Sequence, residues 1–223
     1  MELVGGWVRL MLLMSMVMVV LGGIETPTYT VVHLEKDFEI RLVRPTVWVS
    51  ASVDDISFNQ ATQCGVHRLI HYIQGGNLNH SQIPITTPLL TGIVPSAGPF
   101  FSSAFAVRFY VPSDFQETPP TPFPELDLKV ERWGEKCIAV RQFPGFAKGN
   151  NVAKEAALLE ASLQKTPWGP DATKVDSKDG EDAYTIAEYN PPFHIFGRLN
   201  EVWVDIGDKD ICHLNTIAGS AKA

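Results

Sequence analysis

The order of strand and helix patterns occurs twice along this chain of 223 residues, and that repetition limits the folds open to it. In "FEIRLVRPTVWVSASV", residues 38–53, β-branched and aromatic residues nearly alternate with others around an Arg-Pro break, which predicts two strands and a turn. The period changes in "DISFNQATQCGVHRLIHYIQGGN", residues 55–77, where Asp55 is the expected N-cap of a helix and a Gly-Gly pair its expected end. Two further strand patterns follow, in "SQIPITTPLLTGIVP" and "SSAFAVRFYVPSDF".

The second half of the chain presents the same order. "LDLKVERWGEKCIAVRQFPGF" predicts two strands, and "NNVAKEAALLEASLQKTPWG" predicts a helix that Asn151 caps and Pro167 stops. "AYTIAEYN" and "EVWVDIG" predict the closing strands. The halves are only faintly similar residue by residue, so the order of elements carries the inference of a duplicated strands–helix–strands unit.

Two predicted helices serve about eight predicted strands, and this ratio indicates the fold class. We expect an α+β protein whose mostly antiparallel sheet is curled into a β-barrel flanked by the two helices. The Pro-rich connector "QETPPTPFPELD" is too short to separate independent domains, so one domain is expected.

The first 23 residues differ from the rest. "MELVGGWVRLMLLMSMVMVVLGG" holds one Arg ahead of an apolar run that ends at Leu21, the order expected of a secretory signal peptide. The run is shorter than the roughly 20 apolar residues that a membrane span needs. We therefore predict a signal peptide at 1–23, a domain at 24–207 and a tail of no assigned role at 208–223. The expected destination is secretion or an endomembrane or vacuolar compartment, with no stable membrane association after cleavage; an uncleaved N-terminal anchor is the alternative.

Two further features depend on export. Asn79 begins an Asn-His-Ser sequon for N-glycosylation. The three cysteines, Cys64, Cys137 and Cys212, allow at most one internal disulfide and leave at least one thiol. Their spacing matches no zinc motif, and Cys64 and Cys137 are expected to be buried as small hydrophobic residues.

Charge and motifs exclude several classes of function. The net charge of −7, without any run of Lys and Arg, argues against nucleic acid as a partner. No G-x-S-x-G, P-loop or GxGxxG motif is present. His67 and His71 have the spacing of a zinc-protease helix, but Arg68 stands where that motif needs a Glu base, so no metal ion is expected there. With no catalytic constellation to name, we expect a protein that is not an enzyme.

The first predicted helix has two adjoining faces. One has the spacing of a face packed on a sheet: Phe58, Ala61, Gly65, Leu69 and Tyr72. The other mixes apolar, amide and imidazole side chains: Gln63, Val66, His67, Ile70, His71 and Gln74. Such a mixed surface suits a ligand with an apolar body and an acidic edge, whereas two ordinary surface histidines are the plain alternative.

Longer segments resemble the landmarks of a known family. "FEIRLVRPTVWVSA", "LIHYIQGGN" followed by "QIPITTPLLT", "FAVRFYVPSDFQETPPTP", "CIAVRQFPGFA" and "YNPPFHIFGRLNEVW" are similar to successive segments of the SOUL heme-binding protein family, most closely its exported plant members. The resemblance runs from about residue 28 to residue 205 and includes both halves. It implies a barrel of antiparallel strands flanked by two helices, and reversible binding of heme or another porphyrin rather than catalysis. Ile85 stands where many members carry Met, a volume-conserving difference.

The segment "YNPPFHIFGRLNEVW" also predicts a loop that takes part in binding. Its two consecutive prolines cannot join a central ladder, so a rigid loop must precede the last strand. Related sequences tend to carry a basic residue at the positions of His71 and His194, which implies that both lie near the tetrapyrrole, though not necessarily on its iron. Arg198 is expected to pair with Glu201 or with a loop carbonyl.

These expectations combine into one candidate site along the first helix and the Pro-Pro-Phe-His loop. Its members are Gln63, Val66, His67, Ile70, His71 and His194. The protein would carry, buffer or sense a tetrapyrrole. The alternative is a protein-interaction module of the same fold, which meets a protein partner and has no physiological pigment.

Overall fold

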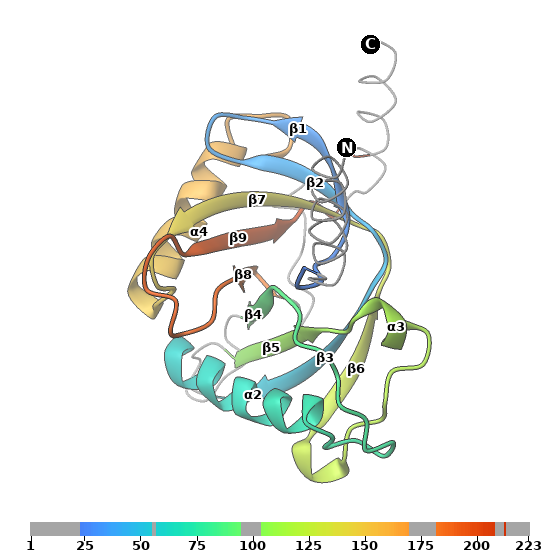
Figure 1. Ribbon diagram of the computed structural model, residues 1–223. Helices are drawn as coiled ribbons and strands as arrows, with labels where there is room; N and C mark the ends of the chain where they lie inside the picture. The colour runs from blue at the N-terminus through green and yellow to red at the C-terminus, as the bar shows by residue number, and fades with distance from the viewer. Residues whose placement is uncertain (1–22, 55–56, 95–103, 170–181, 208–211, 213–223) are drawn as a thin grey trace, which may run out of the picture.

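The computed structural model describes residues 23–54, 57–94, 104–169, 182–207 and 212, so the predicted signal peptide lies almost wholly outside the described residues. Within them, nine antiparallel strands form one sheet curled into a half-barrel, in the order β1-β2-β7-β9-β8-β4-β5-β3-β6 (Figure 1). The strands are β1 (Tyr29–Leu34), β2 (Glu39–Val43), β3 (Thr46–Val53), β4 (Leu89–Val94), β5 (Ala104–Tyr110), β6 (Leu128–Trp133), β7 (Lys136–Pro144), β8 (Tyr184–Glu188) and β9 (Leu199–Asp205). The predicted α+β class with a curled antiparallel sheet is confirmed.

The strand order displays the internal repeat more clearly than the residues do. From its outer side toward the middle of the sheet, one half has the order β2-β7-β9-β8. The other half, read in the same direction, has the order β6-β3-β5-β4, so the strands at each place are equivalent. The first strand of each repeat pairs with the second strand of the other repeat, β2 with β7 and β6 with β3. The two repeats therefore exchange their first strands and form one continuous sheet.

Helix α2 (Phe58–Ile73) fills the place of the first predicted helix. Its N-cap position is held by Ser57 and not by Asp55, which lies outside the described residues. The helix ends where the Gly-Gly pair was expected to stop it, and Gly75 adopts a positive φ of 106° that glycine accommodates without strain.

Helix α4 (Gly149–Leu163) fills the place of the second, and the expected N-cap at Asn151 is wrong. Lys148 holds that position, and the Asn151 side chain accepts the Lys148 backbone N–H at 2.8 Å from within the first turn. This is the reverse half of a capping box: a side chain at the third helical position satisfies the backbone N–H of the N-cap residue. Two short helical turns, α3 (Ser113–Gln116) and η2 (Pro124–Leu126), lie in the Pro-rich connector region.

Both long helices cover the outer face of the sheet, each over its own half (Figure 1). The buried stripe of α2 is the predicted one: Phe58, Ala61, Gly65, Leu69 and Tyr72. A Cβ at Gly65 would come within 2.5 Å of the Val107 side chain, so a glycine is required where α2 crosses β5. α4 buries its own apolar stripe against β7 and β9.

Two buried arginines connect the repeats on the inner face. Arg41 on β2 donates to Glu201 on β9 at 2.8 and 3.0 Å. Arg108 on β5 donates to Glu131 on β6 at 2.8 Å and to Asp182 at 2.6 Å. Each pair joins a strand of the first repeat to a strand of the second, and an unpaired charge at these buried positions would cost several kcal/mol.

A disulfide between Cys137 and Cys212 attaches the start of the predicted tail to β7. Both residues are buried, so Cys137 is buried as expected, and Cys212 gives that tail a structural role that the sequence analysis did not assign. Cys64 is exposed, contrary to expectation, because it lies outside the buried stripe of α2. No helix in the described parts of the chain is long and apolar enough to cross a membrane.

Removal of this disulfide should be measurable as a loss of stability. We expect Cys212→Ala to lower the free energy of unfolding by about 2–4 kcal/mol, because the bridge closes a long loop and so restricts the unfolded chain. Guanidinium denaturation with and without reductant measures the effect. Cys64→Ser is the matched control, with a change below about 0.5 kcal/mol at an exposed position. A wild-type midpoint that reductant leaves unchanged would contradict the prediction.

Candidate functional site

The outer face of α2 carries five of the six predicted site residues. Gln63, His67, Ile70 and His71 are exposed, and Val66 is half-buried against the core beneath the helix. Ile70 is 43% exposed, which is unusually high for an isoleucine. It lies between His67 and His71 in the sequence of the helix. The structure therefore places these five side chains on one accessible surface, as the helical spacing predicted.

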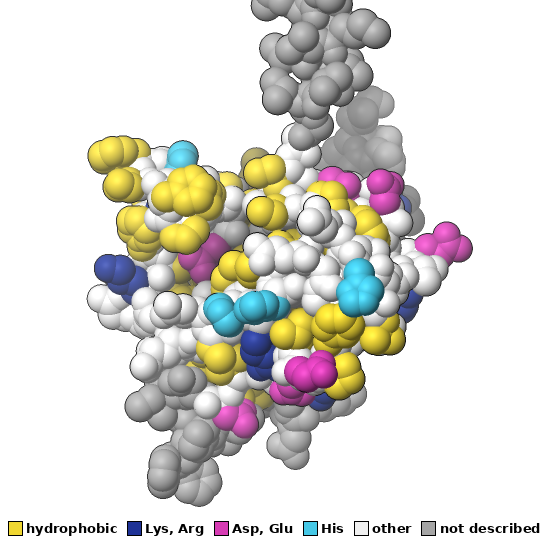
Figure 2. Space-filling view, turned by 60° about the horizontal axis from the view of Figure 1, so that its bottom comes forward, with side chains coloured by type: hydrophobic (Ala, Val, Ile, Leu, Met, Phe, Trp, Pro, Cys, Tyr) yellow, Lys and Arg dark blue, Asp and Glu magenta, His cyan; other side chains and the backbone are white. Residues whose placement is uncertain are grey.

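The two histidines of this surface lie against one another. The ring centroids of His67 and His71 are 4.7 Å apart, with the rings edge to face. Neither imidazole makes a hydrogen bond to another described residue, so its nitrogens stay available to a ligand. Figure 2 shows the face of the molecule that includes α2, where histidine side chains lie beside both apolar and charged side chains.

Arg68 lies on the same helix but is fully engaged elsewhere. Its guanidinium donates to the carbonyl of Leu126 at 2.7 Å, to the carbonyl of Ser52 at 2.8 Å and to the carboxylate of Asp127 at 2.9 Å. These bonds tie η2 and its following turn to α2. The imidazoles are therefore the groups on this face that remain free to meet an anionic ligand edge.

An open cleft of about 490 Å³ adjoins the C-terminal end of this surface. It is lined by His71, Gln74, Gly75, Gly76, Phe123, Glu125 and Leu126. The cleft lies between α2 and η2, so the His71 edge of the helix borders a hollow and not a flat surface.

The loop between β8 and β9 carries the sixth predicted residue, His194, which is exposed. Arg198, only 5% exposed, organises this loop from beneath. Its guanidinium donates to the carbonyls of Pro191 at 2.7 Å, His194 at 2.9 Å and Asn190 at 3.0 Å. The predicted loop ahead of the last strand is confirmed, and three of its carbonyls are bonded to one buried side chain.

The expected partners of Arg198 were half right. The loop carbonyls are its partners, but Glu201 is not, because Glu201 lies on the inner face with Arg41. The acidic neighbour of Arg198 is Glu188, at 3.7 Å. Burial raises the pKa of Glu188, and the nearby guanidinium opposes that rise.

A cluster of exposed apolar side chains surrounds this loop and was not predicted as part of the site. Phe193 is 83% exposed, Phe196 84% and Ile195 65%, and the ring of Phe146 lies 4.3 Å from the Arg198 guanidinium. Large apolar side chains held together in solvent mark binding surfaces. Two aromatics next to a Pro-Pro pair were the sequence signal for it.

The loop and the histidine pair lie toward different ends of α2. The turn that contains Phe146 leads into α4, and the Gly149 backbone N–H there donates to the Asn59 side chain in the first turn of α2. His71 lies twelve positions after Asn59, or about 18 Å along the helix axis. No hydrogen bond or ring contact links the His194 imidazole to another described residue, so the structure groups the five α2 residues and leaves His194 apart.

In the described residues, the convex side of the half-barrel carries both long helices, and α2 exposes there an isoleucine and two imidazoles without hydrogen-bond partners. The chain belongs to the SOUL heme-binding protein family, whose model matches residues 24–205. It is 34% identical to Heme-binding protein 2 of Homo sapiens over 167 residues, 75% of this chain and 77% of that protein. It is 30% identical to Heme-binding protein 1 of Xenopus laevis over 187 residues, 82% of this chain and 93% of that protein.

Proposed function

We propose that this protein reversibly binds heme or a related tetrapyrrole on the outer face of α2, as a carrier, buffer or sensor and not as an enzyme. The observation that carries the proposal is the exposure of Ile70 between two imidazoles that have no hydrogen-bond partner in the described residues. Membership of the SOUL family, and relatives named as heme-binding proteins, supports the choice of ligand.

The residues of this face fit the chemistry of such a ligand. A heme has a flat apolar body, carboxylate edges and an iron that accepts nitrogen ligands. Val66 and Ile70 offer apolar contact to the body, while His67 and His71 offer nitrogens to the carboxylates or to the iron. Because the surface is open on one side, part of the ligand stays in water, which favours reversible over permanent binding.

The β8–β9 loop would cover one edge of the macrocycle with its exposed aromatic side chains. We place His194 at a carboxylate edge and not as the sole iron ligand. An axial imidazole is normally oriented by a contact to its ring; the His194 ring has no hydrogen-bond partner among the described residues and no second imidazole beside it, whereas His67 and His71 pack against each other. The sequence neighbours of His194, Phe193 and Ile195, cannot supply a hydrogen-bond partner.

The same exposed aromatics favour a second candidate, a protein-interaction module without pigment. Phe193 and Phe196 would serve as anchors for a protein partner in the way that aromatic side chains anchor many interfaces. Titration with hemin separates the two: a saturable Soret band at one equivalent supports the pigment, and featureless uptake supports the protein partner.

We also propose that the chain is exported, with cleavage near Gly23 or Ile24. The apolar segment before this point and the Cys137–Cys212 disulfide support the proposal, because structural disulfides persist in oxidising compartments. Asn79 is exposed, as a glycosylated residue must be. N-terminal sequencing of the natural protein should find a start near residue 23 or 24, and an intact Met1 in a soluble, unglycosylated form would exclude export.

A charge placed on the α2 face should prevent binding without unfolding the protein. We expect Ile70→Asp to weaken hemin affinity at least about tenfold, because the carboxylate must be desolvated against the macrocycle and repels the ligand's own carboxylates. Ile70 suits this test better than Val66, since Val66 packs against the core. Absorbance titration at the Soret band measures the affinity.

Leu158→Asp supplies the matched control for this substitution. Leu158 is 39% exposed on α4, so the same change of charge falls on the other helix at similar exposure. It should leave hemin affinity unchanged. Equal affinity of a folded Ile70→Asp protein and the wild type would place the site elsewhere.

Single removals of the histidines should distinguish their roles. For His194→Ala we expect an unchanged Soret position and a binding free energy weaker by about 1 kcal/mol, the size of an exposed ionic contact. If His71 ligates the iron, His71→Ala should shift the Soret band and the ferric spin state. Magnetic resonance of the ferric complex reports both, and a bis-imidazole signal lost on His194→Ala would overturn the role given to His194.

A further inference from the structure

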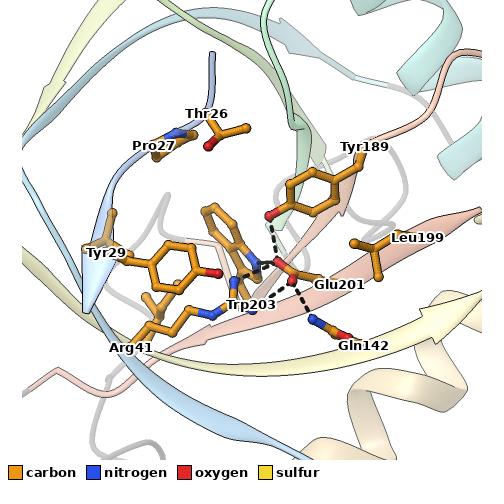
Figure 3. A pocket seen from close by; sticks show the side chains of 11 residues that line it. Thr26, Pro27, Tyr29, Arg41, Gln142, Tyr189, Leu199, Glu201 and Trp203 are labelled. Carbon is orange, nitrogen blue, oxygen red and sulfur yellow. Dashed lines mark hydrogen bonds and ion pairs between the residues drawn. The ribbon is translucent and has the colours of Figure 1, made fainter. Parts of the chain in front are cut away.

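The inner face of the half-barrel contains a hollow of about 140 Å³ that the proposed tetrapyrrole site does not use (Figure 3). It is lined by Thr26, Pro27, Tyr29, Arg41, Val43, Ile138, Gln142, Tyr189, Leu199, Glu201 and Trp203. Thr26 and Gln142 are exposed and Tyr29 is 46% exposed, so the rim is open to solvent. Protein interiors are close-packed, and a hollow of this size beside buried charges is a candidate for a ligand.

The floor of the hollow is a fixed carboxylate. Glu201 is 2% exposed, and besides Arg41 it accepts the Tyr189 hydroxyl at 2.7 Å, the Trp203 indole N–H at 2.8 Å and the Gln142 amide at 3.2 Å. Four different side chains thus hold one carboxylate in place (Figure 3). A floor held this way needs little reorganisation when a ligand enters.

The charge of this network is negative overall. Among the residues that the structure describes, Arg41 is the one cation that lines the hollow, and it is shared between Glu201 and Glu39, both of which it contacts. Tyr189 stays neutral, because burial, and then the Glu201 carboxylate, raises the pKa of its phenol. Two carboxylates against one guanidinium leave an excess of one negative charge.

The walls of the hollow are aromatic. The ring of Tyr29 lies 4.2 Å from the Arg41 guanidinium carbon, so one cation already stacks there. Tyr189 and Trp203 contribute two further rings to the lining. Aromatic faces carry negative potential and attract cations, and they do so more strongly where water is partly excluded.

We propose that this hollow is a second binding site and takes a small organic cation, an ammonium or amidinium whose body is no larger than about one aromatic ring. An apolar cavity of about 150 Å³ admits benzene, so a single ring matches the size. A tetrapyrrole macrocycle, with several joined rings, is too large to enter. An anionic ligand would be repelled by the excess negative charge of the network.

Benzylammonium is the probe for the full-length protein, with benzoate and benzyl alcohol as anionic and neutral probes of the same shape. The indole N–H resonance of Trp203 reports on the floor in proton–nitrogen NMR spectra. Benzylammonium should shift it with half-saturation at or below about 1 mM, and benzoate should bind at least about tenfold more weakly. Saturating hemin should leave the titration unchanged, because the two sites lie on opposite faces of the sheet.

Substitutions at the rim test two parts of the proposal: that the ligand is a cation, and that it contacts the Tyr29 ring. Gln142→Lys puts an ammonium at an exposed position of the rim and should weaken benzylammonium at least about tenfold. Tyr29→Ala should weaken it about three- to tenfold. Phe196→Ala, which removes an exposed aromatic from the β8–β9 loop, should have no effect. Equal affinities for benzoate and benzylammonium, no saturable shift up to about 10 mM, or a folded Gln142→Lys protein with unchanged affinity would each overturn the proposal.

Discussion

The buried pairing of Arg41 with Glu201 is the interaction on which the rest of the structure depends. Along β2, Ile40 and Leu42 face the core beneath α4 while Arg41 faces the inside of the half-barrel. A register slip of one residue would exchange these faces and bury the guanidinium under α4 without a carboxylate. The Arg108 and Glu131 pair has the same effect on β6: burial alone would raise the pKa of Glu131, but the Arg108 guanidinium outweighs it and holds that pKa below its usual range. The exchanged first strands of both repeats are therefore fixed by charge as well as by backbone pairing.

Charges inside the half-barrel also leave little room there for a large ligand. The inner face is occupied by ion pairs and by aromatic packing around Trp48, Tyr110 and Trp203, and what remains there is a hollow of about 140 Å³. That space is sufficient for a small cation and too small for a macrocycle. The outer face of the sheet is covered by α2 and α4, which leaves the exposed sides of these helices accessible to a flat ligand. The way the half-barrel is filled is therefore consistent with the proposed tetrapyrrole site on α2.

The sequence predicted those features that have a local period and missed those that depend on distant partners. The buried stripe of α2 was predicted residue by residue because a helix repeats its faces at a fixed spacing. The loop-carbonyl partners expected for Arg198 were confirmed, whereas the alternative partner Glu201 and the burial of Cys64 were wrong, since both depend on which side of an element meets the sheet. The pairing of Arg41 with Glu201 was not predicted, although a charged residue inside an apolar strand is a signal of a buried pair. The aromatics beside the Pro-Pro pair were a signal in the sequence, but their exposure could not be predicted from it, because an apolar residue in a loop is as often buried under it.

Arg198 links the rigidity of the scaffold to the proposed binding surface. Its guanidinium is bonded to three carbonyls of the β8–β9 loop, and Phe146 stacks against it, so one buried side chain fixes both the loop and the neighbouring turn. Phe193 and Phe196 are therefore held in solvent by the backbone beneath them. A loop ordered before binding loses little entropy when the ligand arrives, which offsets the small contact area of an open surface. At the proposed site, few side chains would therefore suffice to hold a reversible ligand, because the fold has already ordered the β8–β9 loop.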